Sequence, residues 1–265
     1  MRENRRVTTV EQAPTAWACD SLSGTAQDLH EADMSTTRRL VRLNSVTRPA
    51  IVLGSAQRAV RAVAGAVEFF GVDLARRRSG GGAVWLAPGE QCWIDLWLPA
   101  NDPLWVSDVE QSSWWLGECW AQALTLLSAQ TPLSAATRTS LHAAVPQVHR
   151  GPLLDRELSQ IACFAGLGPG EITVDGRKVV GISQRRSRLG AKFQCVVYTQ
   201  WDPEPLLAVL QAAEPTASQR NSDTGLSELG SVLRTRVQAA EIAAVAEQVP
   251  LERQIFDALL TSLPR

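Results

Sequence analysis

The sequence predicts an α+β fold in which helices flank a mixed, largely antiparallel sheet. Its 265 residues are 45% hydrophobic and 20% charged, which is enough apolar surface for a packed core. The order of predicted elements is strand, helix, loop, hairpin, helix, hairpin, strand and helical tail. This order lacks the regular alternation of strands and helices that a parallel, doubly wound sheet requires.

The first part of the chain holds one clear strand and one clear helix. Residues 1–48 are polar and rich in arginine without a sustained period, and only 37–46 fits a strand, at a sheet edge. The apolar run 50–53 reads as a buried strand. Helical spacing of valine, alanine and phenylalanine then predicts a helix over 60–70, which Gly71 ends.

A glycine-rich loop and a hairpin are predicted next. Residues 76–82 read Arg-Arg-Arg-Ser-Gly-Gly-Gly, and three consecutive glycines disfavour helix and strand. The runs 83–86 and 92–98 look like the two strands of a hairpin. Alternate residues of the second run would share one face, namely Cys92, Ile94, Leu96 and Leu98.

The second half is predicted from its turn residues. The capping-box spacing at 107–110 predicts a helix that ends before Pro132. A hairpin over 171–180 turns at Asp175-Gly176, because both residues tolerate a positive φ. A further strand covers 193–199. The nine tryptophans are expected in the core, although some could line an apolar tunnel. Three of them share the predicted helix, namely Trp114, Trp115 and Trp120.

Composition excludes several classes of protein. Lys+Arg 26 against Asp+Glu 27 gives a net charge of -1, so nucleic acid is not expected as a partner. No run approaches the roughly 20 apolar residues that cross a bilayer, and no secretory signal is recognisable, which predicts a cytoplasmic protein without a membrane partner. The cysteines lack C-x-x-C spacing, and the histidines are assigned surface or capping roles, so no metal site is predicted. The histidines are His30, His142 and His149.

Two segments combine residue types that suit chemistry. In 76–82, glycines let backbone N–H groups approach an anion while arginines can bind carboxylate or phosphate. The second segment places Cys163 in a Gly/Pro-rich loop before a hairpin that carries Lys178. Of the 26 basic residues, 24 are arginine, so a lysine at this position suggests that a compact ammonium is needed there rather than a planar guanidinium. Alone, the loop would read as a solvated turn, and the lysine and cysteine as an exposed charge beside a structural thiol.

Taken together, these motifs resemble a known family. Gly-Ser-Ala-Gln at 54–57, Arg-Arg-Arg-Ser-Gly-Gly-Gly-Ala-Val at 76–84 and the segment 171–185, with its Gly-Arg-Lys-x-x-Gly-x-x-Gln, resemble the lipoate-protein ligase and octanoyltransferase family. That family lies within the biotin/lipoyl attachment superfamily. The resemblance spans roughly residues 40–205.

The resemblance implies roles for particular residues. It implies that the glycine loop covers an activated carboxyl group and that Lys178 contacts the reacting carbonyl. Cys163 resembles the nucleophile of the cysteine-dependent octanoyltransferases, and a thiolate could carry the acyl group as a thioester. The implied binding residues are Arg77, Ser79, Gly80, Gly81, Gly82, Ala83, Gly181 and Ser183.

Three functions follow as hypotheses. The leading one is a ligase that uses ATP and Mg²⁺ to form lipoyl-adenylate, and then attaches the lipoyl or octanoyl group to a lysine. The first alternative is a Cys163-dependent transferase from octanoyl-acyl carrier protein, which needs no cofactor. The second is a non-catalytic paralogue that binds a lipoyl domain or acyl ligand, since Trp-Leu-Ala at 85–87 and Leu-Gly-Ala at 189–191 replace histidine motifs of the family.

The implied acceptors are the lipoyl domains of 2-oxoacid dehydrogenase E2 subunits or the glycine cleavage H protein. Acyl carrier protein would be a further partner in the transferase. The predicted organisation is an N-terminal extension (1–39), a lipoyl/biotin ligase-like catalytic domain (40–213), a turn-rich linker (214–231) and a C-terminal helical tail (232–265).

Overall fold

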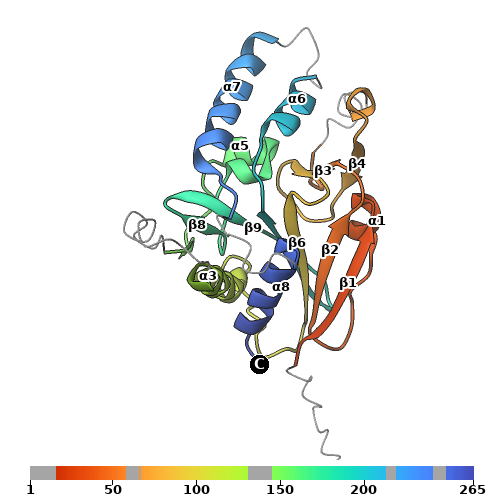
Figure 1. The fold of residues 1–265 in the computed structure, drawn as a ribbon, viewed down its shortest axis with the longest axis vertical. Coiled ribbons are helices and arrows are strands. Elements are labelled where there is room, and N and C mark those ends of the chain that lie inside the picture. Colours follow the sequence, from red (N-terminus) through yellow and green to blue (C-terminus); the bar gives the residue numbers. More distant parts are fainter. Residues whose placement is uncertain (1–15, 58–64, 66, 131–144, 213–218, 241–248) are drawn as a thin grey trace, which may run out of the picture.

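A seven-stranded sheet forms the centre of the fold (Figure 1). The structure is a computed structural model that describes residues 16–57, 65, 67–130, 145–212, 219–240 and 249–265. In spatial order the strands are β1 (Ala18–Gly24), β2 (Leu40–Val46), β6 (Gln91–Pro99), β10 (Gly190–Tyr198), β9 (Arg177–Arg186), β8 (Ile172–Val174) and β7 (Gln147–Val148). The β1–β2 pair is parallel and the other neighbours are antiparallel. The predicted fold class is confirmed.

A second, three-stranded sheet packs beside the first. It consists of β4 (Asp73–Arg76), β3 (Ala50–Leu53) and β5 (Val84–Leu86), with β3 central. Side chains alternate along β3: Ala50 and Val52 share a cluster with Trp93 of the large sheet, whereas Ile51 and Leu53 pack towards helices. Because both faces are covered, the strand is continuously apolar.

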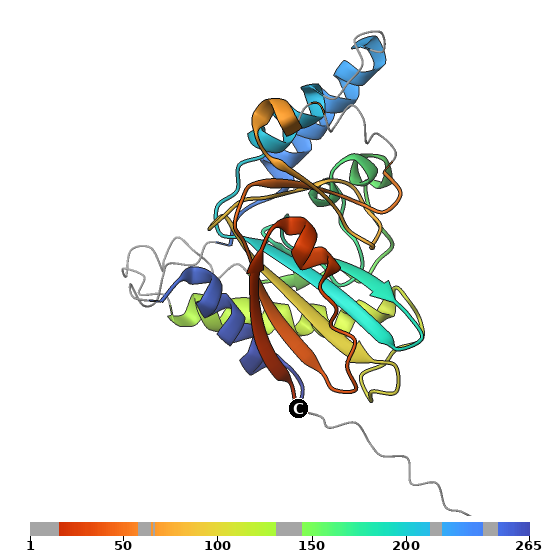
Figure 2. The ribbon, with the colours of Figure 1, turned by 90° about the vertical axis from the view of Figure 1, so that its right-hand side faces the viewer.

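Helices cover the outer surfaces of both sheets (Figure 2). The helices α3 (Trp114–Gln130) and α8 (Leu251–Ser262) lie against one face of the large sheet, where they pack on the predicted apolar face of β6. On the other face lie α1 (Ala26–Glu31) and the small sheet. The far side of the small sheet is covered by α5 (Arg156–Ile161), the short η2 turn (Cys163–Ala165), α6 (Glu204–Ala212) and α7 (Gln219–Arg236). No helix in these ranges is long and apolar enough to cross a bilayer.

Local signals in the sequence predicted several elements correctly. The hairpin between β8 and β9 turns at Asp175 and Gly176, whose φ angles are 49° and 73°. Gly71 follows a helical segment with φ 66°, as a helix-ending glycine should, although most of the helix predicted over 60–70 lies outside the described residues. Trp120 is fully buried in the core beneath α3.

Predictions that depended on strand pairing were wrong in two places. The runs 83–86 and 92–98 do not form a hairpin: β5 pairs with β3, and β6 pairs with β2 and β10, so the chain changes sheet between them. The strand within 37–46 is not an edge, because β2 lies between β1 and β6.

The predicted start of the long helix is also corrected. Asp108 does receive a hydrogen bond from the Gln111 amide at 2.9 Å, but this begins a 3₁₀ turn, η1 (Gln111–Ser113). The α-helix proper starts only at Trp114.

Each of the four predicted segments contributes helices or strands to the fold that the structure describes. Strand β1 is hydrogen-bonded to β2 along its whole length, so the described part of 1–39 is integral to the large sheet. Helix α7 occupies most of the predicted linker 214–231, and residues 213–218 lie outside the described residues. Helix α8 contributes Ile255 and Leu259 to the main core.

Candidate active site

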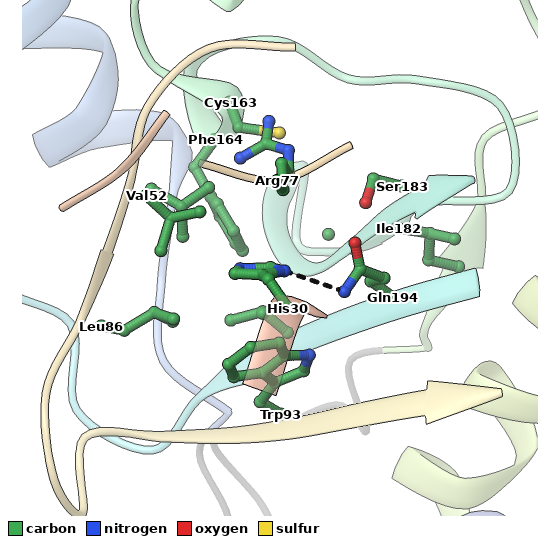
Figure 3. A pocket seen from close by; sticks show the side chains of 13 residues that line it. His30, Val52, Arg77, Leu86, Trp93, Cys163, Phe164, Ile182, Ser183 and Gln194 are labelled. Atoms are coloured by element: carbon green, nitrogen blue, oxygen red, sulfur yellow. Dashed lines mark hydrogen bonds between the residues drawn. The ribbon is translucent and has the colours of Figure 1, made fainter. Parts of the chain in front are cut away.

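A pocket lies between the two sheets (Figure 3). It has an empty volume of about 420 Å³, including its mouth. The small sheet supplies one wall and the large sheet the other, while the loops before β5 and around η2 close it. The lining residues are His30, Val52, Arg77, Val84, Leu86, Trp93, Cys163, Phe164, Gly181, Ile182, Ser183, Gln194 and Val196.

The two segments singled out in the sequence are joined at this pocket. Ala83 forms an isolated parallel bridge with Ala162, and its carbonyl accepts a hydrogen bond from the Cys163 amide at 2.9 Å. Gly82 makes this approach possible, because a Cβ there would lie 2.6 Å from the Ala162 nitrogen. The glycine loop therefore fixes the backbone that carries Cys163.

Arg77 holds the glycine loop from within. Its Nη2 donates to the carbonyls of Gly80 at 2.9 Å and Gly82 at 2.7 Å, and the residue is 3% exposed. Gly81 has φ 94°, and a Cβ on it would lie 2.9 Å from Arg77 Nη2 and 3.4 Å from Cys163 Sγ. The guanidinium and the thiol thus flank one point at the pocket wall.

Strand β9 supplies the remaining predicted binding residues. Gly181 and Ser183 both line the pocket, and Ser79 Oγ donates to Ser183 Oγ at 3.1 Å. A Cβ on Gly181 would lie 2.9 Å from the Phe164 ring. This glycine therefore lets the aromatic ring pack against the sheet.

Lys178 is buried, but it does not line the pocket. Its ammonium lies 2.6 Å from Glu171 Oε2, and it donates to the carbonyls of Gly166 at 2.8 Å and Cys163 at 3.2 Å. The same ammonium lies 4.8 Å from the centre of the Phe164 ring. Lys178 thus holds the loop over residues 163–166, called the cysteine loop below, from the side away from the pocket. Its contact with a reacting carbonyl stays a prediction.

Cys163 differs from the other buried cysteines in its surroundings. Burial raises the pKa of Cys119 to about 12, and it also raises the pKa of Cys92 and of Cys195 well above the usual value, so these core thiols stay protonated. Cys163 is half-buried and lines the pocket. A substrate in the pocket would therefore meet the Cys163 thiol.

The lining also contains His30, Phe164 and Gln194, which the sequence did not single out. Trp93, which lines the pocket too, is one of the nine tryptophans expected in the core or along an apolar tunnel. The His30 ring of α1 lies against Trp93 of β6, with ring centroids 4.5 Å apart and planes tilted by 40°. Its Nδ1 is 3.1 Å from Gln194 Nε2 of β10. The surface or capping role predicted for His30 is therefore wrong. Helix α1 has only six residues, too few for a helical period to show which side faces inward.

Within the described residues, no other histidine or tryptophan lines the pocket. His149 Nε2 lies 2.9 Å from the Pro152 carbonyl, and His142 is outside the described residues. Trp114, Trp115 and Trp120 belong to α3, beyond the opposite face of the large sheet, so they do not line this pocket. In the described part of the chain, no three His, Cys, Asp or Glu side chains are grouped to hold a metal ion.

Solved structures with this fold include lipoate ligases. A lipoate-protein ligase A bound with ATP superposes with a TM-score of 0.60 at 15% identity, covering 95% of this chain and 83% of that one. A Thermoplasma acidophilum protein with bound lipoic acid gives 0.58 at 15% identity, with the same coverage of both chains. A bi-partite lipoate protein ligase described with its E2 lipoyl domain, from the same organism, gives 0.58 at 13%, covering 95% and 82%. At these identities the likeness establishes the fold.

A comparison with curated protein sequences found no match. The family model for the lipoyl protein ligase A/B catalytic domain, however, matches residues 26–250, which include every residue of the pocket. This chain therefore belongs to the lipoyl protein ligase A/B catalytic domain family and is an enzyme of the ligase and lipoyl transferase class.

Proposed function

We propose that this enzyme is a lipoate-protein ligase, which attaches a lipoyl or octanoyl group to one lysine of a lipoyl-carrier domain. The observation that carries the proposal is the apolar pocket that joins the arginine and glycine loop to Cys163 and Ser183. Its acceptors would be lipoyl domains of 2-oxoacid dehydrogenase E2 subunits or the glycine cleavage H protein. We assign the reaction to the cytoplasm.

The proposed reaction has two steps. A carboxylate oxygen of the acid would attack the α-phosphorus of ATP and displace pyrophosphate, which would give lipoyl-adenylate; Mg²⁺, if bound to the triphosphate, would neutralise part of its charge. The lysine amine of the acceptor domain then attacks the acyl carbonyl carbon. The carbon–oxygen bond to AMP would break, an amide would form, and the proton lost by the amine would pass to solvent.

The pocket suits the acyl chain. Val52, Val84 and Leu86 of the small sheet face Trp93 and Val196 of the large sheet across it. An eight-carbon chain held there would lose contact with water along its length, which is favourable by about 0.8 kcal/mol for each buried methylene group. The walls therefore favour a fatty acyl group over a polar ligand.

Cations beside the pocket suit the phosphates of ATP. Arg185 of β9 and Lys192 of β10 are cross-strand partners on the sheet face that also carries Ser183. Arg185 is exposed, and the Lys192 ammonium lies 2.8 Å from Asp95 Oδ2. We propose that these two side chains attract the triphosphate, while Mg²⁺ would enter with the nucleotide rather than on a carboxylate cluster of the described residues.

Cys163 supports a second candidate, an octanoyltransferase. Its thiolate would attack the thioester of octanoyl-acyl carrier protein, forming an acyl-cysteine thioester and releasing the carrier thiol. The acceptor lysine amine would then attack that carbonyl and restore the Cys163 thiol. The placement of Sγ in the pocket, beside Arg77, favours this candidate.

The intact mass of an unmodified lipoyl domain distinguishes the candidates. The domain is incubated with the enzyme and either lipoate, ATP and Mg²⁺ or octanoyl-acyl carrier protein, using wild type, Cys163→Ser and the exposed control Cys19→Ser. A ligase adds a lipoyl mass that survives Cys163→Ser. The transferase adds an octanoyl mass, and Cys163→Ser abolishes this gain. The serine hydroxyl stays protonated at neutral pH and is a much weaker nucleophile than a cysteine thiolate.

The outcome for the acceptor domain also decides the third hypothesis. If neither donor changes the mass while lipoate still binds the enzyme, the proposal of acyl transfer fails and the non-catalytic paralogue is supported. Loss of activity in Cys19→Ser as well would indicate general damage rather than a role for the pocket thiol.

A further inference from the structure

The pocket contains a buried hydrogen-bonding atom without a partner, Nε2 of His30. The imidazole ring lies among the lining residues, with Nδ1 towards Gln194 (Figure 3). Nε2 is buried and has no hydrogen-bond partner within the described residues. Buried polar groups are normally hydrogen-bonded, and this one belongs to a residue that lines the pocket, so we look for its partner on the ligand.

The neighbours of His30 decide which ring nitrogen carries the proton. Asp95 is fully buried, and it accepts hydrogen bonds from Trp93 Nε1 at 2.7 Å and Gln194 Nε2 at 3.3 Å. Because a carboxylate can only accept, it fixes the amide of Gln194 with its NH₂ group towards Asp95. That same NH₂ group is 3.1 Å from His30 Nδ1, which must therefore accept. In the neutral ring the proton is left on Nε2.

The charge of the ring follows from burial and from two cations. Burial, followed by the charges of Lys192 and Arg77, lowers the pKa of His30 to about 3. The ring is consequently neutral at physiological pH and offers one N–H donor. The same cations favour a partially negative oxygen next to that donor.

We propose that His30 Nε2–H donates a hydrogen bond to a carboxylate or carbonyl oxygen of the acyl group in the pocket. This inference rests on the proposed function for the identity of the ligand as an acyl group. The apolar walls would hold the chain, while His30, with its tautomer set by Gln194 and Asp95, selects ligands that carry an oxygen acceptor. His30 is thus a specificity residue whose orientation depends on two positioning residues.

Binding of two ligands to His30→Phe tests this proposal. Octanoate carries the acceptor oxygen, whereas 1-chlorooctane offers a similar chain without it. We expect His30→Phe to weaken octanoate binding about 10- to 100-fold and to leave 1-chlorooctane binding within about 2-fold, as measured by equilibrium dialysis. The matched control is His149→Phe, outside the pocket, which should change neither affinity.

Equal losses for both ligands, or unchanged octanoate binding, would overturn the proposal, as would wild-type protein that binds no octanoate. A second measurement does not depend on a folded variant: the ¹⁵N shifts of the wild-type His30 ring should show a neutral imidazole protonated at Nε2. A ring protonated at Nδ1, or at both nitrogens, contradicts the assignment. Neither test needs ATP or a lipoyl domain, so failed acyl transfer with His30-dependent octanoate binding would reject only the proposed function.

Discussion

Replacing Lys178 with methionine is expected to lower the free energy of unfolding by about 3–5 kcal/mol, because it leaves the Glu171 carboxylate buried without its cation. Both residues are 3% exposed, and their charged atoms are 2.6 Å apart. Glu171 would keep the backbone amides of Gly168 at 2.6 Å and Ile182 at 3.0 Å, which do not replace a full charge. Urea denaturation of wild type and variant measures the difference.

An exposed ion pair provides the matched control. Arg234 and Glu204 are 2.7 Å apart on the surface, so Arg234→Met should change the midpoint of unfolding little. A similarly small change in the unfolding midpoint of Lys178→Met would contradict the prediction that Lys178 and Glu171 form a buried ion pair that stabilises the fold.

The same substitution tests whether Lys178 also contacts the reacting carbonyl. At a temperature where the variants stay folded, Lys178→Met and Glu171→Gln are compared in the lipoyl-domain assay. If Lys178 meets the carbonyl, its loss should cost about 10²–10³ in kcat beyond the effect of Glu171→Gln. If it only holds the loop, the two substitutions should reduce kcat alike, since each breaks the same pair.

Between pH 7 and pH 4, the free energy of unfolding of the wild type is expected to fall by about 3 kcal/mol more than that of the His30→Phe variant. The pKa of His30 is lowered to about 3 in the folded protein, against about 6.5 in an unfolded chain. Between these values the unfolded chain binds a proton that the folded chain does not. Stability from neutral His30 is therefore fully present above pH 6.5 and is lost as the pH falls towards 3.

The measurement is the free energy of unfolding from urea titrations at several pH values. Carboxylates that titrate in the same window contribute to both proteins, so the difference between the curves isolates His30. If the free energies of unfolding of the two proteins changed in parallel with pH, the pKa of His30 would be the same in the folded and the unfolded chain, which would contradict this prediction.

Residue types that lie close together in the sequence predicted the β8–β9 hairpin turn and the two motifs of the candidate site. Asp175-Gly176 predicted its hairpin because few other residues tolerate consecutive positive φ angles. The glycine loop and Cys163 were singled out by residue type, and they meet through the bridge between Ala83 and Ala162. Such signals lie within a few residues of one another, so a single sequence contains them.

Long-range packing determined what the sequence could not reveal. An apolar strand such as β5 fits either sheet, and only the tertiary structure pairs it with β3. His30 and Gln194 are 164 residues apart, and their contact depends on α1 lying over the large sheet. The direction of the Lys178 side chain follows from Glu171 and from the carbonyls of the cysteine loop, which no spacing rule specifies.

We propose that the pocket between the two sheets holds the acyl group that the enzyme transfers, and a crystal structure with bound lipoate would test this placement. We expect the chain to lie between Val52 or Val84 and Trp93, with a carboxyl oxygen within hydrogen-bond distance of His30 Nε2 and near Cys163. Lipoate bound elsewhere on the protein, or a pocket that excludes it at saturating concentration, would contradict the claim.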